Sequence, residues 1–383
     1  MGCCCKKRPV PINIVVSPEH FIDKKDIEKG KKLISLNDFE ILKLIGKGTF
    51  AKVFLVRNKA NQKIYSMKKL NKPFIKQYKQ EQHTINERIL LSKMDYPFLI
   101  KLYCCFQDQE HLYFIMEFAQ GGELFFHLHK EKRFKDEKAK FYIIEIILAI
   151  EYLHKNKMLY RDLKPENVLI DTNGHIKLTD FGLSKIIQKP KEKAYTICGT
   201  PQYLAPEVLS DKGYDCTVDW WSLGCVLYEL LVGRSPFRIL LGDSLNEDFY
   251  KKKILIPDYV SDEAQDLITK LLIINPLKRS GYGEDGANKI KQHPYFKGIN
   301  WDDAWNLKLK PPFIPNLSNE TDLKYFDNMI TDEKLNSDSD LSGISTLNSN
   351  SHKDFKGFTY VADSMGNELM IMDNSNDDST NKV

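Results

Sequence analysis

The chain has 383 residues, of which 42% are hydrophobic and 28% charged, and this length suits one large or two medium globular domains. Its formal net charge of +4 is small for this length and argues neither for nor against nucleic acid, because it says nothing about how the charges cluster. We infer no partner from this charge, and nucleic acid is not among the expected partners. The eight cysteines lack the regular spacing of a disulfide framework or metal knuckle, and no stretch approaches the roughly 20 apolar residues of a membrane span. A reducing, cytoplasmic setting is expected.

Composition divides the chain into three parts. Residues 1–38 form a basic extension rich in Cys, Pro and Lys, and residues 39–297 have dense apolar periodicity. In residues 298–383 the apolar residues become sparse, and this part contains the polar run NSDSDLSGISTLNSNSH. This order predicts a globular middle followed by a solvated tail.

The first elements expected are strands and the later ones helices. DFEILKLIGKGTFAKVFLVRN alternates apolar and polar residues, which predicts two strands joined by a turn at Gly46 and Gly48. Glycines there let backbone N–H groups approach phosphate oxygens, although the same pattern also suits a purely structural hairpin. DEKAKFYIIEIILAIEYLH places Phe141, Ile144 and Leu148 on one helical face. Strands first and helices later indicate an α+β protein of two lobes.

A lysine and a glutamate follow the glycine-rich turn. Lys68 lies in YSMKKL at the end of a predicted strand, and Glu87 lies on a helical pattern in HTINERILL, at a distance suited to reaching Lys68. A pair of this kind holds a lysine at nucleotide phosphates, although Lys–Glu pairs are common and most lysines are simply exposed.

The most specific signal is YRDLKPENVLI. Asp162, Lys164 and Asn167 fall within six positions of one predicted loop. An acid, a cation and an amide so placed can orient a hydroxyl, neutralise a transferring phosphoryl group and bind a metal ion. LTDFGLSK then offers Asp180 as a second metal ligand, and LAPE closes the segment at Glu207.

Together these motifs resemble the eukaryotic protein kinase superfamily over residues 39–297. TICGTPQYLAPE and DWWSLGCVLYELLVG, with KPPFIPN and DLKYFD in the tail, resemble the AGC group that includes cAMP-dependent kinase and protein kinase B. The resemblance implies a bilobal fold with a small sheet-rich N-lobe, a larger helical C-lobe and an AGC C-terminal tail. It also implies ATP and two Mg²⁺ ions as cofactors, with ATP between the lobes, and protein serine or threonine as substrate.

The resemblance assigns catalytic roles residue by residue. Asp162 is expected to orient the substrate hydroxyl and Lys164 to steady the γ-phosphoryl group. Lys68, held by Glu87, is expected to contact the α- and β-phosphates. The implied metal ligands are Asn167 and Asp180. The implied nucleotide site comprises Ile45, Gly46, Lys47, Gly48, Thr49, Phe50, Ala51, Lys52, Val53, Lys68, Met116, Glu117 and Ala119.

Two alternative functions share part of this pattern. A pseudokinase or scaffold has the same fold without phosphoryl transfer and should lack at least one catalytic residue, whereas all of them are present here. A small-molecule kinase has no need of GTPQYLAPE, in which Thr200 resembles the residue that bonds the catalytic aspartate and lysine of Ser/Thr protein kinases.

The segment after LTDFGLSK carries a predicted phosphorylation site. Arg161 directs a positive charge at this segment, and Thr196 in AYTICGT is where the AGC group is phosphorylated, which implies an upstream activating kinase as a partner. The alternative is an ordinary exposed threonine. Cys198 is either redox-sensitive or a passive small residue. Glu207 is expected to pair with Arg279 as a structural link.

The tail carries an aromatic cluster, FKGFTY, at residues 355–360. It resembles the hydrophobic motif of AGC kinases, which implies that Phe355 and Phe358 dock on the small lobe beside the Glu87 helix and that phosphorylated Thr359 strengthens the docking. The competing function is recruitment of an upstream kinase by a passive tail. No Ser-Pro or Thr-Pro turn motif lies between Phe326 and the cluster.

Three glutamates match acidic positions that bind substrate arginines in cAMP-dependent kinase. Glu123, Glu166 and Glu229 therefore predict a basophilic enzyme that prefers arginine two and three residues before the target, although each also suits a structural or solvated role.

The N-terminus MGCCCKKRP predicts lipid attachment. Gly2 suits myristoylation and Cys3, Cys4 and Cys5 suit palmitoylation, and the basic residues that follow suit an anionic membrane surface. Lys6 stands where the myristoylation motif prefers Ser or Thr, so a free cytoplasmic kinase is the alternative.

Overall fold

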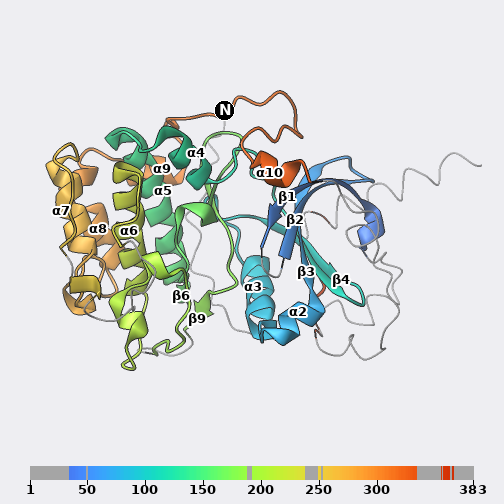
Figure 1. Cartoon of the computed structure of the whole chain (residues 1–383), viewed down its shortest axis with the longest axis horizontal. Coiled ribbons are helices and arrows are strands. Elements are labelled where there is room, and N and C mark those ends of the chain that lie inside the picture. Colours follow the sequence, from blue (N-terminus) through green and yellow to red (C-terminus); the bar gives the residue numbers. More distant parts are fainter. Residues whose placement is uncertain are drawn as a thin grey trace, which may run out of the picture. The chain divides into compact units, whose positions relative to one another are not determined.

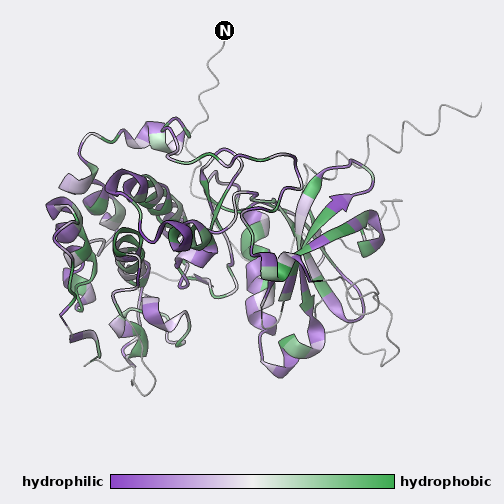
Figure 2. Cartoon of the chain, turned by 45° about the horizontal axis from the view of Figure 1, so that its top comes forward, coloured by the Kyte–Doolittle hydropathy of each residue, from purple (hydrophilic) through white to green (hydrophobic). Residues whose placement is uncertain are grey.

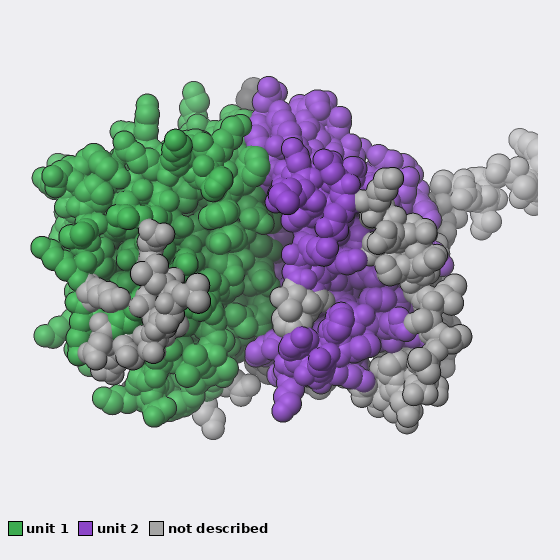
Figure 3. Space-filling view, viewed as in Figure 1, with its two compact units in different colours: residues 1–15, 96–99, 123–315 green, residues 16–95, 100–122, 316–383 purple. Residues whose placement is uncertain are grey.

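The computed structural model describes residues 34–48, 51–187, 192–237, 249–251, 253–333, 355, 357–362 and 365. The chain divides into two compact units, which Figure 3 colours separately. The helical unit contains Tyr96–Leu99 and Glu123–Pro315, and the sheet unit contains Ile100–Gly122 with the described parts of 16–95 and 316–383. A sheet-rich unit and a helix-rich unit confirm the predicted α+β fold.

The sheet unit is built on an antiparallel sheet with the strand order β1-β2-β3-β5-β4-β10. Hydrophobic and hydrophilic residues interleave along its strands (Figure 2), as expected for half-buried strands. The two strands predicted around the glycine-rich turn are confirmed as β1 and β2. The strands are β1 (Phe39–Lys47), β2 (Ala51–Asn58), β3 (Ile64–Asn71), β4 (Leu102–Gln107), β5 (His111–Met116) and β10 (Tyr360–Val361), and the helices are α2 (Lys72–Gln77), α3 (Glu81–Lys93) and α10 (Asn328–Thr331), with a 3₁₀ turn at Leu36–Asp38 (Figure 1).

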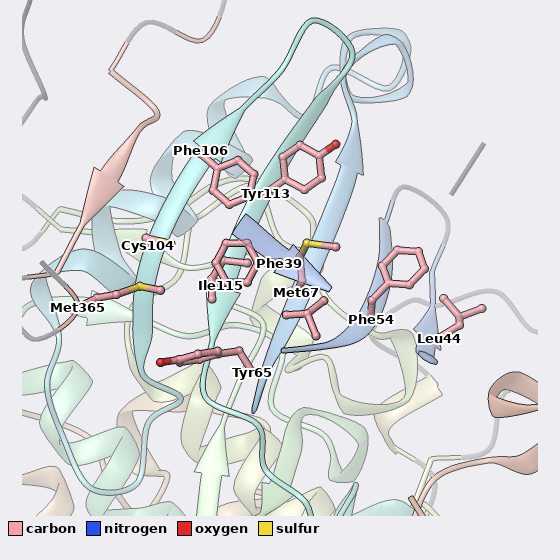
Figure 4. Packing of buried hydrophobic residues seen from close by; sticks show 11 residues of the cluster. Phe39, Leu44, Phe54, Tyr65, Met67, Cys104, Phe106, Tyr113, Ile115 and Met365 are labelled. Atoms are coloured by element: carbon pink, nitrogen blue, oxygen red, sulfur yellow. The ribbon is translucent and has the colours of Figure 1, made fainter. Parts of the chain in front are cut away.

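Aromatic side chains form the centre of the hydrophobic core of the sheet unit (Figure 4). Phe106 stacks on Phe39 and on Tyr113, with ring centroids 5.9 and 4.8 Å apart. Met365, from the C-terminal tail, belongs to the same buried cluster. The tail therefore contributes a side chain to the core of this unit, where burial of an apolar group stabilises the fold by about 1.5–3 kcal/mol.

The helical unit combines helices with two short strand pairs and several turns. Its helices are α4 (Leu124–Glu131), α5 (Asp136–Lys155), α6 (Thr217–Val232), α7 (Asp262–Leu271), α8 (Gly286–Lys291) and α9 (Trp301–Trp305). Its strands are β6 (Met158–Leu159), β7 (Val168–Ile170), β8 (Ile176–Leu178) and β9 (Lys185–Ile186), and its 3₁₀ turns are Pro165–Asn167, Pro201–Tyr203, Pro206–Leu209, Phe249–Lys251, Pro276–Lys278 and Pro294–Phe296. β6 pairs with β9 and β7 with β8, both antiparallel.

Helix α5 is buried around most of its circumference. The sequence predicts one apolar face through Phe141, Ile144 and Leu148, and the structure buries these residues together with every other residue from 141 to 153. The reason is that α5 packs against α6, α9, β6 and β8, so few of its sides face water. None of the helices in the described ranges is long and apolar enough to cross a membrane.

A buried arginine links the end of the predicted activation segment to the helices. Arg279 donates from Nη1 and Nη2 to the two carboxylate oxygens of Glu207, at 2.5 and 2.8 Å, and from Nη1 to the Thr217 carbonyl at 3.0 Å. Its guanidinium carbon lies 5.1 Å from the ring centroid of Trp221. The predicted Glu207–Arg279 pair is confirmed, and its bidentate geometry fixes the segment at the start of α6.

Candidate active site

The loop between β6 and β7, which is predicted to be catalytic, places Asp162 and Lys164 beside Thr200. Thr200 donates from its backbone N–H and its hydroxyl to Asp162 Oδ1, at 3.1 and 2.8 Å. Lys164 Nζ lies 3.0 Å from Asp162 Oδ2 and donates to Thr200 Oγ1 at 2.8 Å. The predicted link of Thr200 to both Asp162 and Lys164 is confirmed, and it holds the carboxylate in one orientation.

A second aspartate, which the sequence interpretation missed, holds the backbone of this loop through hydrogen bonds. Asp219 is fully buried on α6 and accepts hydrogen bonds from the backbone N–H groups of Tyr160 and Arg161, at 3.0 and 2.8 Å, and from His154 Nε2 at 2.7 Å. Arg161 has a left-handed backbone, with φ of 72°. A non-glycine residue in this conformation costs energy, so Asp219 supplies bonds that hold the loop there. The signal was present in DWWSLG, where an acid opens an otherwise apolar helix.

The hairpin of β7 and β8 sets the position of Asn167 and Asp180. Asn167 precedes β7, Asp180 follows β8, and the Thr179 N–H donates to the Asn167 carbonyl at 3.0 Å, so both residues lie at the same end of the hairpin. The Asn167 amide nitrogen donates to the Asp162 carbonyl and carboxylate at 2.7 and 2.9 Å. The amide oxygen is therefore the Asn167 atom that can bind a cation, and oxygen donors from Asn and Asp suit Mg²⁺.

Lys68 and Glu87 meet within the sheet unit. Lys68 lies on β3 and Glu87 on α3, and Lys68 Nζ donates to Glu87 Oε1 at 2.7 Å. The glutamate side chain is only 4% exposed, so the pair is largely withdrawn from water. The predicted pairing is confirmed, and a close, buried pair of this kind fixes the lysine ammonium more firmly than a surface pair would.

The glycine-rich turn and the end of β5 hold the predicted nucleotide residues of the sheet unit. Gly48 N–H donates to the Ala51 carbonyl at 2.8 Å and closes the turn between β1 and β2, while Thr49 and Phe50 lie outside the described residues. Glu117 donates its N–H to the Lys101 carbonyl at 2.9 Å. The Glu117 carbonyl accepts the Ser66 hydroxyl at 2.9 Å, and the Ala119 carbonyl accepts the Gly122 N–H at 3.2 Å, so hydrogen bonds hold the backbone of both predicted adenine-binding residues in place.

Two of the three predicted substrate-binding glutamates lie close enough to influence one another. Tyr203 donates its hydroxyl to Glu229 Oε2 at 2.6 Å, and Glu166 Oε2 is buried without a hydrogen-bond partner among the described residues. Burial raises the pKa of Glu229 to about 7, the Tyr203 hydrogen bond lowers it, and the nearby charge of Glu166 raises it. Glu123 is exposed at the start of α4, and its backbone bridges to Leu169. A buried carboxylate oxygen without a donor among the described residues, and a second carboxyl group with a raised pKa, both favour a cationic ligand.

Thr196 and Cys198 lie in the activation segment near Arg161. The Thr196 side chain is exposed, and its carbonyl accepts a hydrogen bond from Tyr214. Burial raises the pKa of the Cys198 thiol, which favours the passive role over a reactive thiolate.

The tail cluster docks on the sheet unit, as the sequence predicts. Phe355 and Phe358 are buried, and the Phe358 ring packs edge-on against Phe114 with centroids 5.2 Å apart. Arg88 on α3 donates to the Gly357 carbonyl. The next residues form β10, in which Tyr360 pairs with Cys105 of β4. The lipidation candidates Gly2, Cys3, Cys4 and Cys5 lie outside the described residues.

Comparisons with known proteins identify the family of the chain. The model of the protein kinase domain matches residues 39–296. The chain is 43% identical to a RAC family serine/threonine-protein kinase homolog of Dictyostelium discoideum, over 89% of this chain and 75% of that protein. It is also 43% identical to the RAC-beta serine/threonine-protein kinase of Homo sapiens, over 88% of this chain and 70% of that one. Identity to the serine/threonine-protein kinase Sgk1 of Xenopus tropicalis is 44%, over 85% of this chain and 79% of that one. The chain therefore belongs to the protein kinase family and, within it, to the AGC group of serine/threonine kinases.

Proposed function

We propose that this kinase transfers the γ-phosphate of ATP to serine or threonine in basic protein segments, under the control of phosphorylation at Thr196 and Thr359. The observation that carries the proposal is the hydrogen-bonded group of Asp162, Asn167 and Thr200, in which every partner of the Asp162 carboxylate is a donor. A peptide array phosphorylated by the purified enzyme tests it, with Asp180→Ala as the inactive control.

The proposed chemistry uses positioning and electrostatic stabilisation. Asp162 orients the substrate hydroxyl and accepts its proton, and Lys164, held by Thr200, neutralises the transferring phosphoryl group. Bound magnesium supplies charge neutralisation at the phosphates. Asn167 and Asp180, at one end of the β7–β8 hairpin, would supply oxygen donors to the two proposed ions.

The nucleotide-binding assignment rests mainly on the sheet unit. Lys68 contacts the α- and β-phosphates with its charge fixed by Glu87, and the glycines of the turn let phosphate oxygens approach the backbone closely. Met116, with its side chain largely buried at the end of β5, precedes the adenine-binding backbone of Glu117 and Ala119. Ile45, Lys47, Ala51, Lys52 and Val53 complete the proposed loop.

Basic-residue preference rests on Glu123, Glu166 and Glu229. A guanidinium beside Glu166 and Glu229 supplies the donors that the buried Glu166 oxygen lacks among the described residues, and it offsets the repulsion between the two carboxylates. Peptides with arginine two and three residues before the target should be phosphorylated faster than alanine-substituted peptides. Equal rates of phosphorylation on the two peptide sets would contradict the proposed preference for basic residues.

The raised pKa of Glu229 predicts a pH-dependent Michaelis constant. Glu229 loses its proton as the pH rises through about 7, and only the carboxylate attracts arginine. The KM for an arginine peptide should therefore fall by about fivefold between about pH 6 and pH 8, equivalent to roughly 1 kcal/mol of binding. Steady-state kinetics with Glu229→Gln should give a nearly flat KM, and the alanine peptide serves as the substrate control. A wild-type KM that does not change with pH contradicts the prediction.

Phosphorylation of Thr196 is proposed to order the activation segment through Arg161. A phosphate adds about −1.5 to −2 charges and accepts guanidinium donors well. Thr196 is exposed to an upstream kinase, and the Arg161 Nη1 and the Thr196 carbonyl share the Tyr214 hydroxyl as a partner, so the guanidinium is near. Thr359 is proposed to strengthen tail docking when phosphorylated.

The N-terminus is proposed to hold a cytoplasmic enzyme at membranes. Myristate on Gly2 and palmitate on Cys3, Cys4 or Cys5 would together give stable attachment where one chain alone is reversible. Fractionation should show wild type in the membrane pellet and a variant with all three cysteines changed to serine in the supernatant. Two fully soluble proteins would leave no support for an anchor.

A further inference from the structure

The Tyr214 hydroxyl lies between the catalytic loop and the activation segment. It accepts a hydrogen bond from Arg161 Nη1 at 3.0 Å and donates one to the Thr196 carbonyl at 2.6 Å. The Tyr214 side chain is buried, with 2% of its surface exposed. One hydroxyl therefore joins the residue beside Asp162 to the predicted phosphorylation site, at a place shielded from water.

The backbone around Tyr214 fixes that hydroxyl. Tyr214 and Ala194 exchange two backbone hydrogen bonds, at 2.8 and 2.9 Å. The neighbouring Gly213 has φ of 69°, and a Cβ there would lie 2.6 Å from the Tyr195 ring, so the backbone approaches this aromatic closely. Burial raises the pKa of Tyr214 to about 12, and the hydroxyl therefore keeps its proton for Thr196 at neutral pH.

The other bonds of Arg161 show what the hydroxyl adds. Arg161 Nε donates to the Leu183 carbonyl at 2.5 Å, and its backbone N–H is held by Asp219. Nη1 makes its bond to Tyr214, which orients the far end of the guanidinium. Hydrogen bonds that involve a charged group in a buried site are stronger than those between neutral groups.

We propose that Tyr214 is a positioning residue that docks the activation segment onto Arg161 before Thr196 is phosphorylated. The phosphate later reaches the guanidinium directly, so the hydroxyl matters most in the unphosphorylated enzyme. This dependence on phosphorylation rests on the proposed role of Thr196. The docking itself does not, because it follows from the two hydrogen bonds.

The test compares Tyr214→Phe with wild type in two states, unphosphorylated and phosphorylated at Thr196 as verified by mass spectrometry. Loss of the hydroxyl should lower kcat/KM about fivefold in the unphosphorylated state and less than about twofold in the phosphorylated state, in keeping with one charge-assisted hydrogen bond. Tyr142→Phe is the matched control, because the Tyr142 hydroxyl is buried in the same unit and has no hydrogen-bond partner among the described residues. It should leave kcat/KM unchanged in both states.

Backbone amide exchange gives a readout independent of catalysis. Amides of residues 192–198 should exchange faster in unphosphorylated Tyr214→Phe than in wild type, and phosphorylation should remove much of the difference. Equal losses of kcat/KM in both states, or unchanged exchange in this segment, overturn the proposal. If phosphorylation of Thr196 leaves wild-type activity unchanged, the regulatory part of the proposed function fails, while the unphosphorylated comparison and the exchange rates still decide the role of Tyr214.

Discussion

Replacing Asp162 with asparagine is expected to lower kcat by about 10³-fold, the scale of an efficient general base together with its positioning, while KM for ATP changes less than about twofold. Both carboxylate oxygens face donors. Oδ1 accepts from the N–H and hydroxyl of Thr200, and Oδ2 accepts from Asn167. Asparagine replaces one carboxylate oxygen with an NH₂ group, which is a hydrogen-bond donor. In either orientation of the amide, this NH₂ group faces a donor from Thr200 or Asn167, and the side chain can no longer accept the substrate proton.

Purified Asp162→Asn and wild type should be compared by steady-state kinetics on the same peptide, with thermal unfolding as a check of folding. Asp258→Asn, at an exposed aspartate of the helical unit, is the matched control and should retain wild-type kcat. A properly folded Asp162→Asn enzyme with kcat within about tenfold of wild type would show that the proposed proton acceptor is misassigned.

The sequence predicts which residues form the candidate site, but it predicts only some of the hydrogen bonds and ion pairs that hold these residues in place. Lys68 with Glu87, Thr200 with Asp162, and Glu207 with Arg279 could be paired because each pair lies in recognisable motifs. These motifs carry chemistry that few other residue combinations supply, so short stretches suffice to identify them.

The supporting network could not be predicted because it joins residues that no local pattern connects. Asp219 bonds to Tyr160 across 59 positions, and His175 donates from Nδ1 to the buried Glu145 at 2.6 Å across 30 positions. Glu145 also accepts the N–H of Ile176 and so fixes the start of β8 from α5. An acid within an apolar helix indicates a buried polar partner, but helical periodicity cannot say which one.

The docked tail is the second place where the structure goes beyond the sequence. The motif FKGFTY predicts that two aromatics bind the small lobe, and the structure adds a strand, β10, that extends the sheet beside β4. Gln107, the last residue of β4, donates its side-chain amide to the Phe355 carbonyl at 3.0 Å, and the Tyr360 hydroxyl donates to the Ser92 carbonyl at 3.3 Å. The tail therefore binds β4 and also α3, the helix that carries Glu87, through both its backbone and its side chains.

These contacts connect tail docking to the Lys68–Glu87 pair through helix α3. Arg88, adjacent to Glu87, donates to the Gly357 carbonyl, and Ser92, one turn later, accepts from Tyr360. Burial of two phenylalanine rings stabilises docking by about 2 kcal/mol or more each, before the cost of ordering the tail is subtracted. A ligand shifts an equilibrium only by its differential affinity for the two states, so activation requires that the tail bind the paired arrangement better.

Removal of one ring is expected to undock the tail and lower activity. Phe358→Ala should reduce kcat/KM of the Thr196-phosphorylated enzyme by about 30-fold, which corresponds to roughly 2 kcal/mol of lost docking, because Phe358 fills a buried position against Phe114. Phosphorylation of Thr359 should raise kcat/KM of the wild type above that of the unmodified tail. The alternative role, recruitment of an upstream kinase, predicts no change once Thr196 already carries its phosphate.

Two further measurements separate loss of docking from loss of folding. Phe74→Ala, at an aromatic of the same unit that is 48% exposed, is the matched control and should keep wild-type kcat/KM. A synthetic peptide of residues 353–362 should restore activity to Phe358→Ala only at about millimolar concentration, because tethering gives the native tail an effective concentration of that order. If wild type, Phe358→Ala and the Thr359-phosphorylated protein agree within about twofold, a difference of roughly 0.4 kcal/mol, the tail does not activate the enzyme and its aromatics serve recruitment alone.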